Sequence, residues 1–299
     1  MKRSFLTIPD ISAEELSTVL SMATVPIDEL GSPLRGLGAA LIFEKPSNRT
    51  RQSMEMAVFQ LGGHPIYTRG DEVGFDVREP VEDIARIMSG YHAVLAARVF
   101  DHDLLERLAA AASVPVVNML SDYAHPLQAL ADTLTMQQLL GPLDDKVVAW
   151  VGDYNNVARS LAEACVMLGM HVRIAAPLDF GATDAELERI SLLGDGSVSQ
   201  SHRAEEAVEG ADAVHTDTWV SMGQEAEKPE RVKIFEGFQV DEALMERASP
   251  AAMFFHCLPA YRGLEVSSGV IDGPASRVFQ QGHNRLHASR ALLAWLVAQ

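Results

Sequence analysis

The chain alternates short β-rich runs with segments of helical periodicity along almost its whole length. This alternation is typical of a parallel sheet whose strands are joined by crossover helices. The candidate strands are Ala39–Phe43, Val94–Arg98, Val114–Met119, Val147–Gly152, His171–Ala176, Ala213–Thr216 and Met253–Cys257. Helical patterns follow Ser47, with a stop at Gly62 and Gly63, and recur at Val81–Ser89, His102–Ala112, Pro126–Leu140, Asn156–Leu168, Thr183–Leu192 and Asn284–Val297.

A length of 299 residues favours two domains of ordinary size. The best boundary lies near Gly141 and Pro142, where the long helix ends, and Lys146 begins a new strand. We therefore predict an α/β fold with two doubly wound parallel-sheet domains of similar size, residues 1–140 and 141–299, and a ligand cleft between them. The C-terminal helix, residues 284–298, is expected to pack back on the first domain.

Composition excludes several classes of function. The net charge of −17 disfavours nucleic-acid binding, because an acidic chain repels a phosphate backbone. No run of 18 apolar residues could span a membrane, and the first residues contain no apolar signal segment. Two cysteines make no disulfide framework and fit a reducing cytoplasm.

The segment from Phe43 to Arg51 joins a predicted strand to a predicted helix. Ser47 is a natural N-cap, and the first helical turn has unpaired backbone N–H groups. Together with Arg49 and Arg51, this helix start indicates a phosphate or carboxylate site at the carboxyl end of the sheet, although a capped helix with solvated arginines explains the local pattern equally well.

A second polar segment, Asp122–Gln128, also joins a strand to a helix. Pro126 suits the first helical position, so His125 and Gln128 lie on the opening turn, where they could bond a carbonyl oxygen. Arg98 ends its own strand. Taken alone, the histidine is more often structural, and the arginine an ion-pair partner.

In the second half, Gly152–Asn156 follows a strand but lacks the G-x-G-x-x-G pattern, which disfavours NAD. The adjacent asparagines could instead bind a small polar ligand. Asp217–Gly223 ends a strand and continues into a loop that could close over a substrate, although a surface loop is the simpler interpretation. Cys257 ends another strand and is by default a buried, inert thiol. No cysteine and histidine spacing indicates zinc, and we predict neither a metal nor a cofactor.

Together these segments resemble the aspartate/ornithine carbamoyltransferase family along essentially the whole chain. Ser47–Arg51 resembles the S-x-R-T-R element and His125–Gln128 the H-P-x-Q element that the family shares. Asp217 with Ser221, Met222 and Gly223 resembles the D-x-x-x-S-M-G loop of the ornithine type. His256–Pro259 reads H-C-L-P, where the aspartate type has H-P-L-P, and Asn284–His287 also matches the ornithine type.

The resemblance implies carbamoyl transfer from carbamoyl phosphate to ornithine, with citrulline and phosphate as products, by a cytoplasmic homotrimer that binds neither nucleic acid nor membrane. It implies that Arg98, His125, Asp217 and Cys257 are catalytic. It assigns carbamoyl phosphate to Ser47, Asn48, Arg49, Thr50, Arg98, His125, Gln128, Cys257, Leu258 and Arg285. It assigns ornithine to Asn156, Asp217, Ser221 and Met222.

Two positions depart from the family pattern, and several alternatives stay open. Asn48 replaces a threonine but can still cap and donate. Glu72 takes the place of a customary glutamine, and a carboxylate near a phosphate is repulsive unless Arg69 or Arg78 pairs with it. The acceptor could be N-acetylornithine, N-succinylornithine or putrescine. The chain could also be a non-catalytic binding paralogue or, in another class, an NAD-dependent oxidoreductase.

Overall fold

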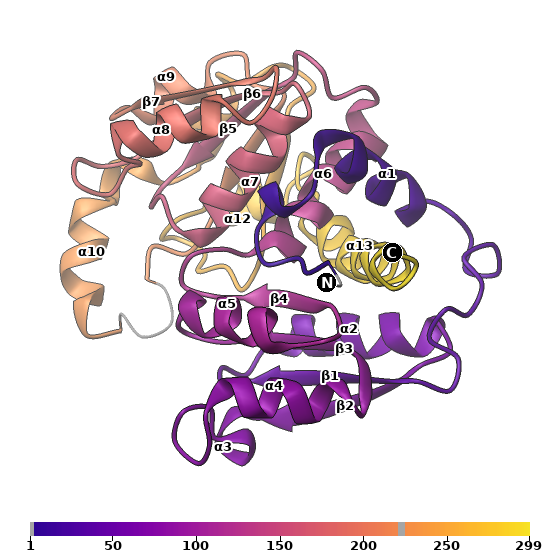
Figure 1. Cartoon of the computed structure of the whole chain (residues 1–299). Coiled ribbons are helices and arrows are strands. Elements are labelled where there is room, and N and C mark those ends of the chain that lie inside the picture. The colour runs from indigo at the N-terminus through magenta and orange to yellow at the C-terminus, as the bar shows by residue number, and fades with distance from the viewer. Residues whose placement is uncertain (1–2, 221–224) are drawn as a thin grey trace. The chain divides into compact units, whose positions relative to one another are not determined.

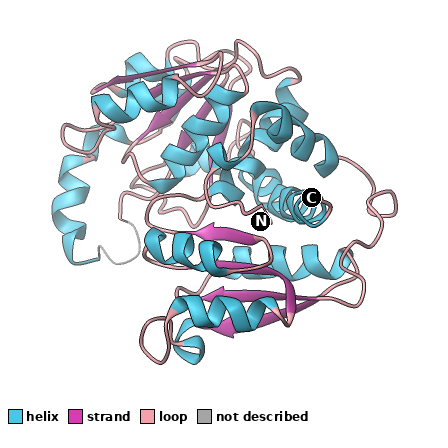
Figure 2. Ribbon diagram, viewed as in Figure 1, coloured by secondary structure: helices cyan, strands magenta, loops and turns pink. Residues whose placement is uncertain are grey.

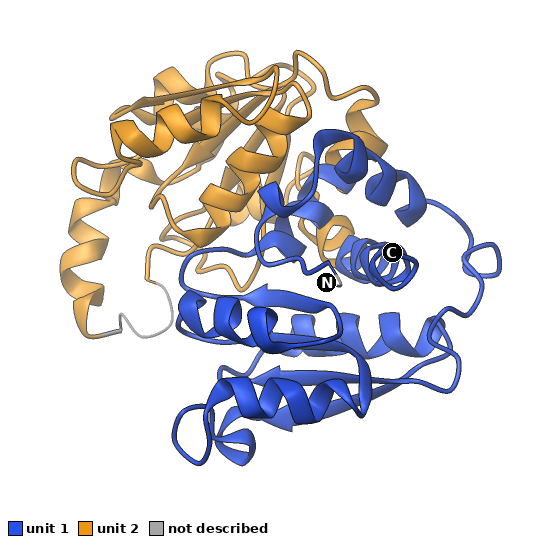
Figure 3. Cartoon of the chain, viewed as in Figure 1, with its two compact units in different colours: residues 1–134, 283–299 blue, residues 135–282 orange. Residues whose placement is uncertain are grey.

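A computed structural model describes residues 3–220 and 225–299 of the chain. The chain divides into two compact units (Figure 3): unit 1 comprises Met1–Leu134 and His283–Gln299, and unit 2 comprises Thr135–Gly282. The division falls inside helix α6, Pro126–Leu140. Unit 1 thus contains segments from both ends of the chain.

Unit 1 contains a four-stranded parallel sheet in the order β2-β1-β3-β4 (Figures 1 and 2). The strands are β1 Gly38–Phe43, β2 His64–Arg69, β3 His92–Arg98 and β4 Val116–Leu120. One face of this sheet, with Ile42 and Leu95, packs against apolar side chains such as Ile84 and Leu105. The helices of this half are α1 Ala13–Ala23, α2 Asn48–Gln60, α3 Gly70–Val73, α4 Val81–Ser89, α5 His102–Ala111, the first part of α6 and most of α13 Val278–Val297.

Unit 2 contains a five-stranded parallel sheet in the order β7-β6-β5-β8-β9. The strands are β5 Val147–Val151, β6 His171–Ala175, β7 Ser197–Ser201, β8 Ala213–Thr216 and β9 Met253–His256. Its helices are α7 Asn156–Met167, α8 Asp184–Ser191, α9 Ala204–Val208, α10 Lys228–Ile234, α11 Glu242–Met245 and α12 Ser268–Ile271.

The unit 2 sheet is buried on both faces. Trp150 and Phe255 belong to an apolar cluster with residues of α7, whereas Val151 and Phe254 belong to a second cluster with residues of α9, α11 and α12. Neighbouring residues of one strand enter different clusters because successive side chains point to opposite faces. Central strands of this kind are continuous apolar runs, which is why the sequence revealed them.

The two strands that the sequence analysis did not predict, β2 and β7, are both edge strands. β2 contains Pro65. Proline cannot donate a ladder hydrogen bond, and an edge strand tolerates it because one side of that strand has no partner strand. β7 reads Ser-Val-Ser-Gln-Ser and has a single apolar residue. An edge strand needs less apolar surface than a central one, so these segments lack the pattern on which the prediction relies.

Helix α13, Val278–Val297, begins earlier than the predicted helix at 284–298. Arg290 on this helix donates to the side chain of Gln60, at the end of α2, over 3.0 Å. The buried guanidinium of Arg290 thus bonds this helix to the N-terminal part of the chain. No helix in the described part of the chain is both long and apolar enough to cross a bilayer.

Candidate active site

In unit 1, the predicted anion site lies at the start of α2, directly after β1. Ser47 is the N-cap, and its side chain accepts a hydrogen bond from the backbone N–H of Thr50 at 3.4 Å. Asn48 and Arg49 occupy the first turn, where backbone N–H groups lack intrahelical acceptors. Arg51, in contrast, forms an ion pair with Glu55 and lies over the Tyr67 ring. The helix start has the backbone geometry that suits a bound anion.

Arg285 connects three helices of unit 1. Its guanidinium donates to the side-chain oxygen of Gln128 on α6 at 2.6 Å and to the hydroxyl of Thr50 on α2 at 3.1 Å. The amide nitrogen of Gln128 in turn donates to Asp132. Thr50, Gln128 and Asp132 are all almost fully buried. These bonds hold Thr50 and Gln128 in fixed orientations.

His125 immediately precedes α6 and is only 5% exposed. Burial lowers the pKa of His125 well below its usual value, and the charges of Arg285 and Arg98 lower it further. Arg98, the last residue of β3, is itself buried. His125 is therefore a neutral imidazole among cations, which can donate or accept a hydrogen bond but carries no charge near neutral pH.

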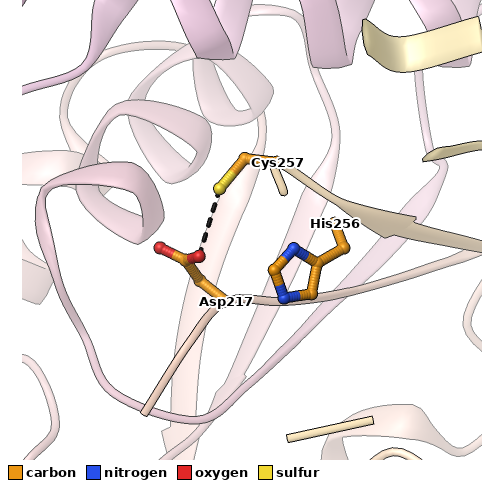
Figure 4. Close-up of side chains that lie close together, drawn as sticks. All are labelled: Asp217, His256 and Cys257. Atoms are coloured by element: carbon orange, nitrogen blue, oxygen red, sulfur yellow. Dashed lines mark hydrogen bonds between the residues drawn. The ribbon is translucent and has the colours of Figure 1, made fainter. Parts of the chain in front are cut away.

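In unit 2, Asp217 and Cys257 lie at the ends of neighbouring strands. Asp217 directly follows β8, Cys257 directly follows β9, and these strands pair in parallel. The Cys257 thiol is 3.1 Å from one carboxylate oxygen of Asp217, and its S–H donates to that oxygen (Figure 4). The predicted strand included Cys257, but the observed strand ends at His256, so the thiol is on the turn that follows.

The Asp217 carboxylate is held by two further donors. The backbone N–H of Thr218 donates to the oxygen that faces Cys257, at 2.8 Å, and the side-chain amide of Asn155 donates to the other oxygen at 2.9 Å. Asp217 is 8% exposed. Its carboxylate is therefore fixed in orientation by three donors and is largely buried.

The structure adds Asn155, which the sequence analysis did not select, to the residues that contact Asp217. Asn155 caps α7 with its side-chain oxygen and contacts Asp217 with its side-chain nitrogen. Asn156, which the sequence analysis selected, is the first residue of α7. The doubled asparagine was the available signal, because the residue before a helix is the usual capping position. Ser221 and Met222 lie outside the described residues.

A second missed residue, Arg231 on α10, anchors the segment that follows Asp217. Its guanidinium forms an ion pair with Asp153 and donates to the backbone oxygen of Trp219. The buried cation also lies over the rings of Phe180 and Phe235. Nothing in the local sequence indicated this contact, since Asp153 and Arg231 are far apart along the chain.

His256 lies beside Asp217 and Cys257, and ligand atoms of the three residues are within 4.8 Å of one another (Figure 4). Such a group could hold a metal ion, a possibility that sequence spacing did not indicate. However, the Nδ1 atom of His256 accepts from the backbone N–H of Leu258, and Nε2 contacts Glu265. Both ring nitrogens are thus engaged within the protein, which favours a hydrogen-bonding role for His256 over a ligand role.

Glu72 lies on the short helix α3. Its carboxylate accepts from the backbone N–H of Arg69 at 3.3 Å, while the Arg69 side chain pairs with Asp71. The side chain of Arg78 donates to the backbone oxygen of Glu72 at 3.0 Å. The Glu72 carboxylate therefore accepts a backbone hydrogen bond at the start of its own helix.

Comparison with known proteins agrees with these features. Residues 3–138 match the family model described as the carbamoyl-P binding domain of aspartate/ornithine carbamoyltransferase, and residues 144–296 match its Asp/Orn binding domain. The chain is 44% identical to an ornithine carbamoyltransferase of Thermus thermophilus over 99% of its length and 97% of the relative. It is also 44% identical to an anabolic ornithine carbamoyltransferase of Pyrococcus furiosus, over 98% of the chain and 95% of the relative.

A solved structure of ornithine carbamoyltransferase from Pyrococcus furiosus superimposes with a TM-score of 0.93 at 42% identity, covering 98% of this chain and 96% of that one. The likeness extends over both parallel-sheet units. The motifs, the fold and both family matches agree, and the chain belongs to the aspartate/ornithine carbamoyltransferase family.

Proposed function

We propose that this chain transfers the carbamoyl group of carbamoyl phosphate to the δ-amino group of L-ornithine, giving L-citrulline and phosphate in arginine biosynthesis. The observation that carries this proposal is the fixed Asp217 carboxylate, with the Cys257 thiol and the Asn155 amide bonded to its two oxygens. A carboxylate in this position suits a cationic amino-acid substrate. The names of the Thermus and Pyrococcus relatives support ornithine as that substrate.

Carbamoyl phosphate is proposed to bind first, on unit 1. The start of α2, with Ser47, Asn48, Arg49 and Thr50, holds the phosphate through backbone N–H groups and positive charge. Arg98, His125 and Gln128 hold the carbamoyl group. Arg285 orients Gln128 and Thr50 by donating a hydrogen bond to each. Donors aimed at the carbonyl oxygen stabilise the negative charge that develops there during attack.

Ornithine is proposed to bind second, on unit 2. Asn156, Asp217, Ser221 and Met222 hold its α-amino and α-carboxylate groups, and Asp217 with Cys257 orients the δ-amino group. The δ-amino group must first lose a proton, because an ammonium has no lone pair. Cys257 and the backbone of Leu258 complete the contacts to the carbamoyl group. Asn155 adds a role that the sequence did not reveal, since it fixes the second oxygen of Asp217.

The chemical step forms one bond and breaks another. The lone pair of the δ-nitrogen attacks the carbamoyl carbon, the carbonyl oxygen takes up negative charge, and the C–O bond to phosphate then breaks. The phosphate leaves with the bonding electron pair and takes up the further proton that the attacking nitrogen loses. Phosphate is a good leaving group, so no covalent enzyme intermediate or cofactor is required, and positioning of both substrates supplies much of the acceleration.

The test is citrulline formation by the purified chain from carbamoyl phosphate and ornithine, with N-acetylornithine, putrescine and aspartate in parallel. Turnover with ornithine alone is the expected result. Turnover with another acceptor instead would replace ornithine in the proposal. Binding of carbamoyl phosphate without turnover of any acceptor would favour the non-catalytic paralogue.

We further propose that the chain works as a cytoplasmic homotrimer. Exposed apolar side chains on unit 1, among them Phe59 on α2, Ile66 on the edge strand β2 and Tyr91, support an interface between copies. Neither Cys165 nor Cys257 is in a disulfide, in keeping with a reducing compartment. Light scattering after size exclusion should give three times the chain mass of 32.5 kDa; a mass of one chain would contradict the trimer.

A further inference from the structure

The turn that carries Cys257 is closed by a buried pair, His256 and Glu265, that the proposed reaction does not use. Both side chains are fully buried, and Nε2 of His256 lies 3.2 Å from one carboxylate oxygen of Glu265. His256 is the last residue of β9, and its backbone N–H donates to the side chain of Gln281 at 3.0 Å. The strand end is therefore held from two directions.

The hydrogen bonds determine which nitrogen of His256 carries the proton. The backbone N–H of Leu258 can only donate, and it points to Nδ1 at 2.9 Å, so Nδ1 is the acceptor. The proton is consequently on Nε2, and Nε2–H donates to Glu265. His256 thus spans from the carboxylate of Glu265 to the backbone that immediately follows Cys257.

Glu265 also bonds the far part of the same loop. The oxygen that accepts from His256 accepts as well from the backbone N–H of Tyr261 at 2.6 Å. One carboxylate oxygen therefore connects both ends of the segment from His256 to Tyr261. Within that segment Leu258 has a φ of +57°, a left-handed conformation that costs a non-glycine residue free energy and persists only when its surroundings impose it.

We propose that Glu265 is a positioning residue: through His256 it fixes the turn that places the Cys257 thiol against Asp217 and sets the direction of the Leu258 backbone. This role rests on the proposed function insofar as Cys257 and Leu258 contact the substrates. It assigns no proton transfer to Glu265 or His256.

Substitution of Glu265 provides the test, because one replacement preserves the geometry and another removes it. Glu265→Gln keeps a side-chain oxygen that can accept from both His256 and Tyr261, whereas Glu265→Leu removes both acceptors at similar volume. We expect Glu265→Gln to retain kcat within about threefold and Glu265→Leu to lose about 100-fold, as a small displacement of a reacting group does. The KM for carbamoyl phosphate should stay near the wild-type value in Glu265→Gln and rise in Glu265→Leu, because the Leu258 backbone is proposed to contact the carbamoyl group.

Glu163→Leu is the matched control. Glu163 is equally buried in unit 2, yet its partner is Arg189 and it has no contact with the turn. The control should lose stability without a comparable loss of kcat. Equal losses of kcat in the two leucine variants would overturn the positioning role, since general destabilisation would explain both.

A readout that does not depend on turnover separates this proposal from the proposed function. Cys165 is fully buried and Cys257 is half-buried, so iodoacetamide should alkylate Cys257 first. The alkylation rate should change at least about fivefold in Glu265→Leu and remain near the wild-type rate in Glu265→Gln, because thiol reactivity follows the local environment. Absence of citrulline formation with this alkylation pattern would refute the function but not the positioning role.

If Glu265→Leu does not fold, His256→Asn tests the positioning role instead. Asparagine can still accept from the N–H of Leu258 but cannot reach Glu265. We expect a loss of kcat of at least about tenfold, with Cys257 alkylation altered. Wild-type kcat and alkylation in folded His256→Asn would overturn the proposal.

Discussion

Unit 1 and unit 2 both place their candidate functional residues at the carboxyl ends of parallel strands, where such sheets commonly bind ligands. In unit 1 those residues are arginines around a buried neutral imidazole, His125. In unit 2 they are a carboxylate, Asp217, with a thiol and an amide bonded to it. The same architecture thus supports opposite electrostatics. The difference matches two substrates of opposite character, a phosphate anion and an amine that arrives as a cation.

The largest expected effect comes from removing the negative charge of unit 2. Asp217→Asn keeps an oxygen that can accept from the N–H of Thr218 but has no charge to attract and orient ornithine. We expect kcat/KM for ornithine to fall by about 1,000-fold, in line with the loss of one partner of a desolvated charge pair. Calorimetric titration with carbamoyl phosphate should show unchanged affinity for that substrate. A parallel loss of carbamoyl-phosphate affinity would contradict the assignment of one substrate to each unit.

The next effect tests whether His125 acts as a neutral group. Burial lowers its pKa well below the usual value, so it stays uncharged near neutral pH. His125→Gln should lower kcat by about 100-fold through loss of one donor to the carbonyl oxygen. Because the pKa of His125 lies well below 6.5, the pH profiles of kcat for wild type and variant should run parallel around neutral pH. A limb near pH 6.5 that disappears in the variant would mean that His125 acts as an acid or base.

A smaller effect sharpens the role of Asn155 in unit 2. Asn155→Ala removes both the cap of α7 and the bond to Asp217, so we expect KM for ornithine to rise about tenfold and stability to fall by about 1 kcal/mol. Thr183→Ala is the control, because Thr183 caps α8 without contacting Asp217. It should cost similar stability with little change in KM. A similar rise of KM in both variants would show that Asn155 acts only as a cap.

The last prediction concerns stability rather than turnover, at Glu163, the buried acid of unit 2. Burial raises the pKa of Glu163 to about 7, against the lowering effect of Arg189. Between pH 4.5 and 7 the folded chain then binds more protons than the unfolded chain, so this group makes stability fall as pH rises. Urea unfolding should show Glu163→Gln gaining up to about 3 kcal/mol relative to wild type across that range. Parallel stability curves would show that Glu163 is charged throughout.

Local sequence patterns predicted the fold class and the central strands of both sheets correctly. It also placed the polar segments at strand ends, because continuous apolar runs and N-caps are local signals that depend on neighbouring residues. It missed β2 and β7, two edge strands with few apolar residues, and it did not select Asn155, whose contact with Asp217 depends on packing.

The bonds between side chains, in contrast, follow from how the folded chain packs. Arg231 reaches Asp153, Arg285 reaches Thr50, and His256 reaches Glu265 through contacts between residues that packing brings together. Burial likewise decided that His125 is neutral, because the same histidine in water would titrate near its ordinary pKa. Hydrogen-bond direction and desolvation depend on atoms distant in the chain, so a local sequence pattern cannot reveal them.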